Sequence, residues 1–189
     1  MPPKVRITKE DIVKTAVELV RVGGAGAINA RAIAAALNCS TQPIFSNFAT
    51  MEELIKSVID KGYALYQGFI KNEVESGRYP QYKAYGMAYV RFAKEEKELF
   101  KLLFMRDRSE EDLSPSPDFD ESVQIIMEAN SVSKETATLI HLEMWSCAHG
   151  IGTMLATSFL PLELELVSDM MSDLYQGIKT RYLKKEDER

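Results

Sequence analysis

Hydrophobic positions repeat at helical spacing along almost the whole chain, and no stretch of any length shows the alternation of a β-strand. Between Lys9 and Val22, apolar residues fall at i, i+1, i+4, i+7 and i+8, which is one face of an amphipathic helix; they are Ile12, Val13, Ala16, Leu19 and Val20. Thr8 is a suitable N-cap, and the glycine-rich run 23–27 ends the helix, because glycine favours left-handed helix ends. The pattern predicts an all-α protein.

Two short helices follow within the first fifty residues. Asn29 is expected to cap a helix over Ala30–Leu37, and the break Asn38-Cys39-Ser40 separates it from a third helix over Thr41–Phe48. Asn38 tolerates the left-handed conformation, Ser40 is expected to cap the third helix, and Pro43 fits in the first turn of that helix. The residues predicted to face inward are Ile33, Ala34 and Leu37 on the second helix, and Ile44, Phe45 and Phe48 on the third.

Longer helices are predicted after residue 50. An acidic stretch at 107–121 that contains Pro115 and Pro117 is the best loop candidate. We expect about nine helices, three of them in a short domain over residues 1–50 and the others in a larger helical domain over residues 51–189. The helices predicted after residue 50 are Met51–Ser76, Gln81–Glu95, Lys97–Met105, Asp120–Ala129, Ser133–Thr157 and Pro161–Lys184.

Composition narrows the class of protein. Of 189 residues, 46% are apolar, which is enough for a sizeable core. The two cysteines form no CxxC motif or paired framework, no apolar run is long enough to span a membrane, and the N-terminus lacks a secretory signal. We therefore expect a reduced, cytoplasmic protein without membrane association.

Charge is distributed unevenly along the chain. The net charge is −5, yet residues 1–56 carry seven basic and five acidic side chains, so this segment is +2 and the remainder is −7. A mildly basic head on an acidic body suits a DNA-binding protein, although the asymmetry alone does not decide function.

The second and third short helices have the spacing of a helix-turn-helix. In such a unit the outer side of the last helix enters the major groove, where short polar side chains contact bases and phosphates. Here that side offers Gln42 and Asn47, which can pair bidentately with adenine. The residues predicted to bind DNA are Asn29, Arg31, Ser40, Thr41, Gln42, Pro43, Ser46 and Asn47.

The stretch INARAIAAALNCSTQPIFSNFATMEEL, residues Ile28–Leu54, resembles the DNA-binding signature of the tetracycline-repressor (TetR) family. The resemblance implies a dimeric transcription regulator, most simply a repressor released from palindromic operator DNA by a small apolar or amphipathic effector. It also implies that residues 1–50 form the helix-turn-helix DNA-binding domain and residues 51–189 the effector-binding and dimerisation domain. Trp145…His149-Gly150 also resembles an element of the effector domain in some members. The matching positions in the signature are Asn29, Arg31, Ile33-Ala34, Asn38-Cys39-Ser40, Phe45, Phe48 and Glu52-Glu53-Leu54.

Two positions depart from the family pattern. The family usually has a tyrosine at Phe45 and a lysine at Met51, and both contact phosphates. Their loss predicts weaker DNA binding or greater reliance on base contacts, with compensation from Lys4, Arg6 and Lys9 of the N-terminal arm. An alternative hypothesis is a helical ligand-binding or interaction module that has lost useful DNA affinity.

The body is rich in aromatic residues and methionine, which suit either a pocket for a flat, apolar effector or an ordinary helical core. Trp145 and His149 lie four residues apart, on one helix face, where they could orient the polar end of a ligand. The alternative for His149 is a buried side chain bonded to a backbone carbonyl. The residues predicted to bind the effector are Tyr89, Phe92, Phe104, Trp145 and His149.

The last two helices are the predicted homodimer surface. The first has small residues that permit close approach, and the second has more apolar surface than one side of a monomeric helix requires. The resemblance implies a four-helix bundle that sets the two recognition helices about 34 Å or more apart. The residues concerned are Ala148, Gly150, Gly152 and Ala156, then Leu162, Leu166, Val167, Met170, Met171, Leu174 and Ile178.

Enzymatic function is not expected. Cys147 and His149 lie two apart on a helix and point in different directions, and the chain lacks the common phosphate-binding, hydrolase and metalloprotease motifs. The acidic residues of the 107–120 segment lack the spacing of a calcium loop. We therefore expect no catalytic residues, no metal and no cofactor.

Overall fold

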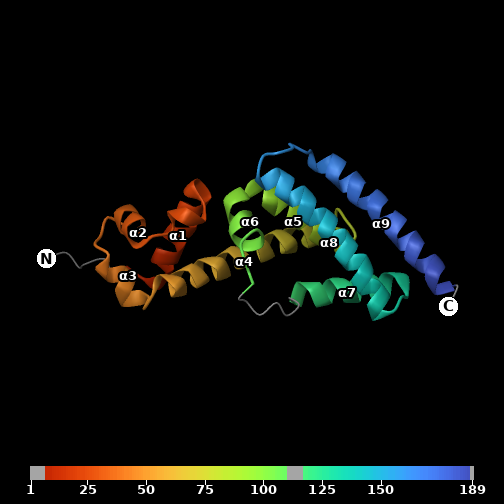
Figure 1. Cartoon of the computed structure of the whole chain (residues 1–189), viewed down its shortest axis with the longest axis horizontal. Helices are drawn as coiled ribbons and strands as arrows, with labels where there is room; N and C mark the ends of the chain where they lie inside the picture. The colour runs from red at the N-terminus through yellow and green to blue at the C-terminus, as the bar shows by residue number, and fades with distance from the viewer. Residues whose placement is uncertain (1–6, 110–116, 188–189) are drawn as a thin grey trace. The chain divides into compact units, whose positions relative to one another are not determined.

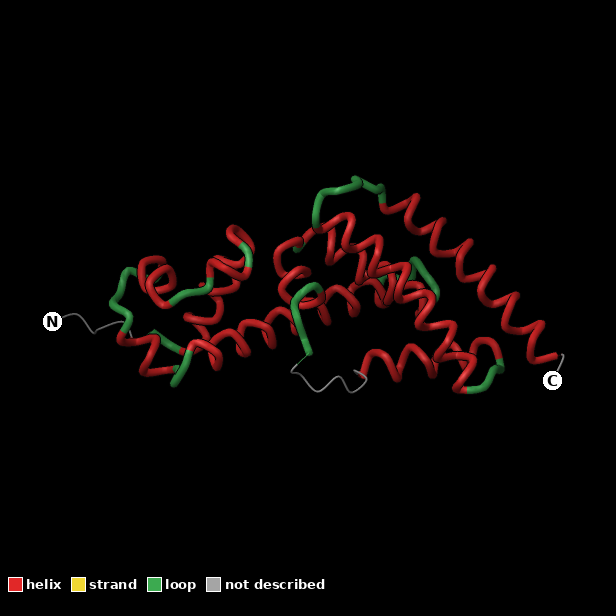
Figure 2. The backbone as a smooth tube through the Cα atoms, viewed as in Figure 1, coloured by secondary structure: helices red, strands yellow, loops and turns green. Residues whose placement is uncertain are grey.

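A computed structural model describes residues 7–109 and 117–187 as helices joined by loops, with no strand in these ranges (Figures 1 and 2). The elements in chain order are α1 (Lys9–Gly23), the 3₁₀ turn η1 (Ala25–Ala27), α2 (Ala30–Ala36), α3 (Gln42–Asn47), α4 (Met51–Glu75), α5 (Gln81–Glu95), α6 (Lys97–Phe104), α7 (Pro117–Asn130), α8 (Lys134–Ala156) and α9 (Leu164–Asp187).

Contacts divide the chain into two compact units. Unit 1 comprises the residues up to Gln67 together with Glu96–Arg106, and unit 2 comprises Gly68–Glu95 and the residues from Asp107 onward. Helix α4 contributes to both units, and the chain passes between them again at the junction of α5 and α6.

Local signals set the beginnings and ends of the first helices. Thr8 caps α1 through a reciprocal box, in which its side chain accepts from the Asp11 N–H while the Asp11 carboxylate accepts from the Thr8 N–H. Gly24 ends α1 at a φ of 70°, and the Asn29 side chain caps α2 by accepting from the Ala32 N–H. Asn38 takes a φ of 50° in the turn after α2, so its predicted left-handed conformation is confirmed.

The all-helical fold is confirmed, with small differences at the element ends. Ser40 was predicted to cap α3, and this is wrong: the N-cap is Thr41, whose side chain makes no capping bond. Helix α7 begins at Pro117, because proline suits the first turn and Asp118 and Asp120 favour a helix start. Helix α9 begins only at Leu164, and the turn η1 was not predicted at all.

Unit 1 is centred on one buried face of α1. Val17 and Val20 are buried there together with residues of the neighbouring helices, and α1 contacts α2, α3 and α6. Arg21 on α1 also forms a two-pronged ion pair with Glu96, with N–O distances of 2.6 and 2.9 Å. The fully or almost fully buried side chains of unit 1 include Ile12, Ile33, Ile44, Phe48, Leu54, Val58, Leu99, Phe100 and Leu103.

Unit 2 packs α8 against α5, α7 and α9. The small residues Ala148, Gly152 and Ala156 are buried inside the chain. Their predicted place on a dimer surface is therefore wrong. These small residues instead allow α8 to pack closely against the other helices of its own unit. Gly150 has no atom within 4 Å of the position that a Cβ would occupy.

The capping box of α1 gives the first prediction. Replacing Thr8 by Ala removes the side-chain acceptor for the Asp11 N–H, and we expect the free energy of unfolding to fall by about 1 kcal/mol. Urea unfolding followed by circular dichroism measures it. Thr180→Ala is the control, because the exposed Thr180 hydroxyl caps no helix and donates only to the Gln176 carbonyl of its own helix. This substitution should change the free energy of unfolding by no more than about 0.5 kcal/mol. Equal losses in both variants would contradict the role of the cap.

Candidate functional site

Two buried side chains hold α3 in place. Ile44 and Phe48 are 0% and 1% exposed, respectively. The Lys9 ammonium lies 4.5 Å from the centroid of the Phe48 ring and 2.9 Å from the Glu53 carboxylate. Glu53 also accepts from the Ala49 N–H, and the Lys9 and Ala49 bonds lower the pKa of this carboxyl. The beginnings of α1 and α4 are thereby joined around the end of α3.

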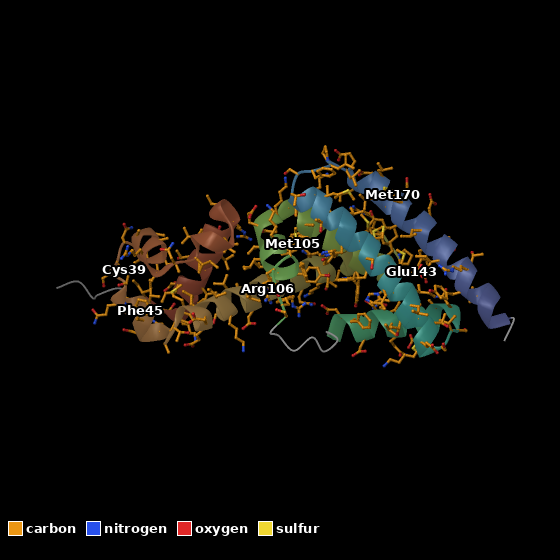
Figure 3. All side chains as sticks on the ribbon, viewed as in Figure 1. Cys39, Phe45, Met105, Arg106, Glu143 and Met170 are labelled. Atoms are coloured by element: carbon orange, nitrogen blue, oxygen red, sulfur yellow. The ribbon has the colours of Figure 1, made fainter. Side chains whose placement is uncertain are left out.

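Phe45 was predicted to face inward with Ile44 and Phe48, and this is wrong. Its side chain is 53% exposed on α3 (labelled in Figure 3). Ile44 and Phe48 are four residues apart and share the buried face, whereas Phe45 is rotated by one position onto the outer face of the helix. Helical periodicity could have indicated this placement, because a six-residue helix has room for one buried stripe only.

Polar side chains surround Phe45 on the outer face. Gln42 and Ser46 are exposed, while Thr41 and Asn47 are half-buried. The Ser46 hydroxyl lies 2.9 Å from the Gln42 carbonyl oxygen, and the Asn47 amide donates to the Pro43 carbonyl over 2.8 Å. Ser46 and Asn47 thus each hold a hydrogen bond within the helix, while the Gln42 side-chain amide has no partner among the described residues.

The other predicted DNA-binding residues are less uniform. Ser40 is exposed in the turn before α3, and Pro43 is half-buried in its first turn. The Asn29 side chain is committed to capping α2, whereas Arg31 is exposed and has no partner among the described residues. Lys4 and Arg6 lie outside the described residues. No observation tests DNA contact by any of these residues, so their role stays a prediction.

Three of the predicted effector residues form one cluster in unit 2. The ring of Trp145 stacks on that of His149 with centroids 5.3 Å apart and planes at 21°. The Tyr89 hydroxyl and Nδ1 of His149 share a hydrogen bond of 2.8 Å, whose direction follows the histidine tautomer. Trp145 is 47% exposed and Tyr89 is buried, so the cluster extends from the surface of α8 to the side of α5. Burial lowers the pKa of His149 and favours its neutral form.

The remaining two candidates pack elsewhere. Phe92 is fully buried in unit 2 and meets Phe69 edge to face, with centroids 5.3 Å apart. Phe104 belongs to unit 1, where Tyr63 and Tyr66 pack edge-on against its ring. Both positions are compatible with the alternative that these rings fill the core.

A second polar cluster of unit 2 was not anticipated from the sequence. The Tyr82 hydroxyl and Nδ1 of His141 lie 3.0 Å apart, and the Asn130 amide donates to the Tyr175 hydroxyl over 2.8 Å. Burial lowers the pKa of His141 to about 4 and raises that of Tyr82, so both are neutral at pH 7. The spacing of His141, Trp145 and His149 at i, i+4 and i+8 was the one available signal.

Exposed apolar side chains gather on α8 and α9. On α8 they repeat every three residues, which places them on one face, and Met170 on α9 is labelled in Figure 3. On α9, Val167, Met171 and Ile178 are instead buried within the chain. The exposed large apolar residues of the two helices are Leu139, Leu142 and Trp145 on α8, and Leu166 and Met170 on α9.

The described residues offer neither a metal-binding cluster nor a membrane-spanning helix. No group of three or more His, Cys, Asp or Glu side chains in these ranges is arranged to hold a metal ion. None of the helices there combines the length and the apolarity that crossing a bilayer requires.

Residues 82–174, which run from α5 into α9 and include both His141 and His149, match the family described as the tetracyclin repressor-like C-terminal domain. This chain belongs to the TetR family of transcription regulators. The expected family and its all-helical fold are thereby confirmed, and the match lies outside the N-terminal signature that first indicated the resemblance.

Solved structures share the fold of this TetR-family chain. One is a TetR-like transcriptional regulator from Rhodococcus sp. RHA1, with a TM-score of 0.68 and 16% identity over 93% of this chain and 96% of the other. Another is a protein of unknown function from Rhodococcus sp. RHA1, with a TM-score of 0.74 and 19% identity over 94% of this chain and 98% of the other. No curated protein matches the chain.

The stacked pair gives the second prediction. Trp145 is the one tryptophan of the chain, so its fluorescence reports on this cluster alone. An imidazolium stacked on an indole quenches its emission, and the lowered pKa of His149 places this protonation below pH 6.5. Emission should therefore hold steady from pH 8 to about 6.5 and fall below it.

Two variants separate the histidines in this titration. His149→Gln should abolish the fall in emission, whereas His141→Gln should retain it, because Phe119 and Tyr82 rather than Trp145 contact His141. A midpoint above 6.5, or the same titration in His149→Gln, would contradict the stacked, desolvated pair.

Proposed function

We propose that this TetR-family chain is a dimeric DNA-binding regulator, and most simply a repressor. It binds a palindromic operator through α3 and releases it when a small apolar or amphipathic effector binds unit 2. The single observation that carries the proposal is the two-sided character of α3, which buries Ile44 and Phe48 and leaves Gln42 and Phe45 exposed.

This geometry matches the needs of a recognition helix. A helix entering the major groove requires a firm inner anchor and an outer face that can meet base edges. The Asn38 turn between α2 and α3 has the left-handed residue that a tight helix-turn-helix connection needs. A short polar surface of this kind is common on helices. The buried Ile44 and Phe48 and the left-handed Asn38 in the turn are what distinguish a helix-turn-helix from an ordinary helix pair.

The dimer part of the proposal rests on α8 and α9. The exposed side chains of Leu139 and Leu142 on α8, and of Leu166 and Met170 on α9, are costly in water. A second copy that covers these four side chains relieves this cost and leaves Trp145 to the effector site. A twofold axis through this face would repeat each α3, so that the two copies meet successive major grooves about 34 Å apart. Palindromic DNA follows from that symmetry.

The effector part rests on the Tyr89–His149–Trp145 cluster. It offers a flat exposed ring next to a neutral imidazole, which suits a ligand with an apolar face and one polar group. Helix α4 belongs to both units, and Gly68 lies at the point where the units divide. A ligand that shifts α4 would lower operator affinity, and operator DNA would weaken ligand binding by the same factor.

The alternative function is a helical ligand-binding or interaction module without useful DNA affinity. Two observations favour it: Phe45 and Met51 cannot donate to phosphates, and Lys9 is engaged by Glu53 rather than left for DNA. The two proposals differ in whether a sequence-specific complex forms at low salt.

Selection from a random duplex library gives the third prediction. The full chain at low salt should enrich a palindrome, and Gln42→Ala should weaken its binding about tenfold while relaxing preference at one adenine of each half-site. Mobility shift measures this, with Gln124→Ala as the control because that exposed glutamine lies on α7. Recovery of no specific sequence would favour the ligand-binding module instead.

The apolar face gives the fourth prediction. The wild-type chain should sediment at twice its mass of 21.3 kDa, and the double variant Leu142→Glu with Leu166→Glu should sediment as a monomer. Val22→Glu is the matched control, because Val22 is 90% exposed on α1 and lies outside α8 and α9. A wild-type monomer, or a double variant that stays dimeric, would contradict the proposed surface.

A further inference from the structure

The helix-turn-helix of this chain is almost uncharged. Between Ala25 and Met51 the sequence has one charged residue, Arg31, which is exposed. Affinity for DNA from ionic contacts scales with the number of phosphates that are neutralised, so this segment can draw little from them. Binding through this surface depends on contacts to the bases.

Few groups on the outer face of α3 are available for such contacts. Gln42, Phe45 and Ser46 are exposed at spacings of three and four residues, which is one stripe of a helix. The Ser46 hydroxyl is bonded to the Gln42 carbonyl. The amide of Gln42 and the ring of Phe45 are the two large groups that remain on this stripe.

The Phe45 side chain has neither a donor nor an acceptor, so it cannot hydrogen-bond to a phosphate or to a base edge. The apolar group that the major groove presents is the 5-methyl of thymine. We propose that Phe45 determines sequence specificity by packing on this methyl group. The inference rests on the proposed DNA-binding function and adds the base that the exposed ring recognises.

The spacing of the two side chains sets where this thymine lies. Residues three apart on a helix are displaced by about 4.5 Å along its axis, which is close to the separation of about 3.4 Å between stacked bases. Gln42 reading an adenine therefore places Phe45 at the neighbouring base pair or the one beyond it. The ring then requires a thymine within two base pairs of the adenine that Gln42 reads.

The test removes the methyl group alone. In the selected operator each thymine is replaced in turn by deoxyuridine, which keeps every donor and acceptor of the base, and the full chain is titrated by fluorescence anisotropy. We expect one position in each half-site at which affinity falls about fourfold, as burial of one methyl predicts. Phe45→Ala should bind the thymine and uracil duplexes equally.

Further variants keep the outcome decisive. Phe159→Ala is the control, because Phe159 is 80% exposed and lies in the loop between α8 and α9, and it should keep the wild-type sensitivity. Thermal unfolding checks the fold of Phe45→Ala, and Phe45→Ser takes its place if that fold is lost. The proposal is supported if replacing that thymine by deoxyuridine no longer lowers the affinity of the Phe45 variant but still lowers the affinity of the Phe159→Ala control.

The remaining outcomes overturn it. Equal affinity of the wild-type chain for all uracil duplexes, or unchanged sensitivity in the Phe45 variant, refutes the methyl contact and leaves the regulator proposal intact. Failure to select any specific duplex refutes the regulator proposal, and the inference falls with it.

Discussion

The structure of unit 1 depends on the burial of Ile44 and Phe48. A helix of six residues is far too short to be stable by itself, because nucleation outweighs the few hydrogen bonds that it gains. Burying a phenylalanine contributes about 1.5–3 kcal/mol, and Lys9 above the ring of Phe48 ties the beginnings of α1 and α4 to the same point. Without these two buried side chains, α3 would not be held as a helix with one fixed outer face.

The same anchor decides which chemistry remains outside. Once Ile44 and Phe48 occupy the inner stripe, Phe45 must lie among Gln42 and Ser46. That outer face combines one available amide with one large apolar ring and carries no charge. It is suited to reading base edges and poorly suited to holding phosphates. In unit 2, by contrast, desolvation lowers the pKa of the buried His141 and of the half-buried His149 and favours their neutral forms.

Much of the fold could be predicted from the sequence, because helical periodicity and caps are local signals. Thr8, Asn29 and Asn38 behave as their side chains dictate. The errors have two sources. Phe45 is as apolar as Phe48, and it was placed by this apolar character and not by its helical position, one residue from Ile44 and away from the buried stripe. The small residues of α8 depend instead on a partner that is distant in sequence. Ala148, Gly152 and Ala156 permit close packing against any neighbour, and the sequence could not show that it comes from the same chain. The stacking of Trp145 on His149 followed from their spacing, whereas the Tyr89 and Tyr82 bonds across helices did not.

In the proposed function, DNA contacts one surface, which is formed by the outer side of α2, the turn and α3. Hydrogen–deuterium exchange of the full chain, with and without its selected duplex, tests this most directly, because it reports on every segment at once. The account predicts that DNA slows exchange in peptides covering residues 29–51, with little direct effect on α7. Unchanged exchange over 29–51, with protection confined to unit 2, would contradict it.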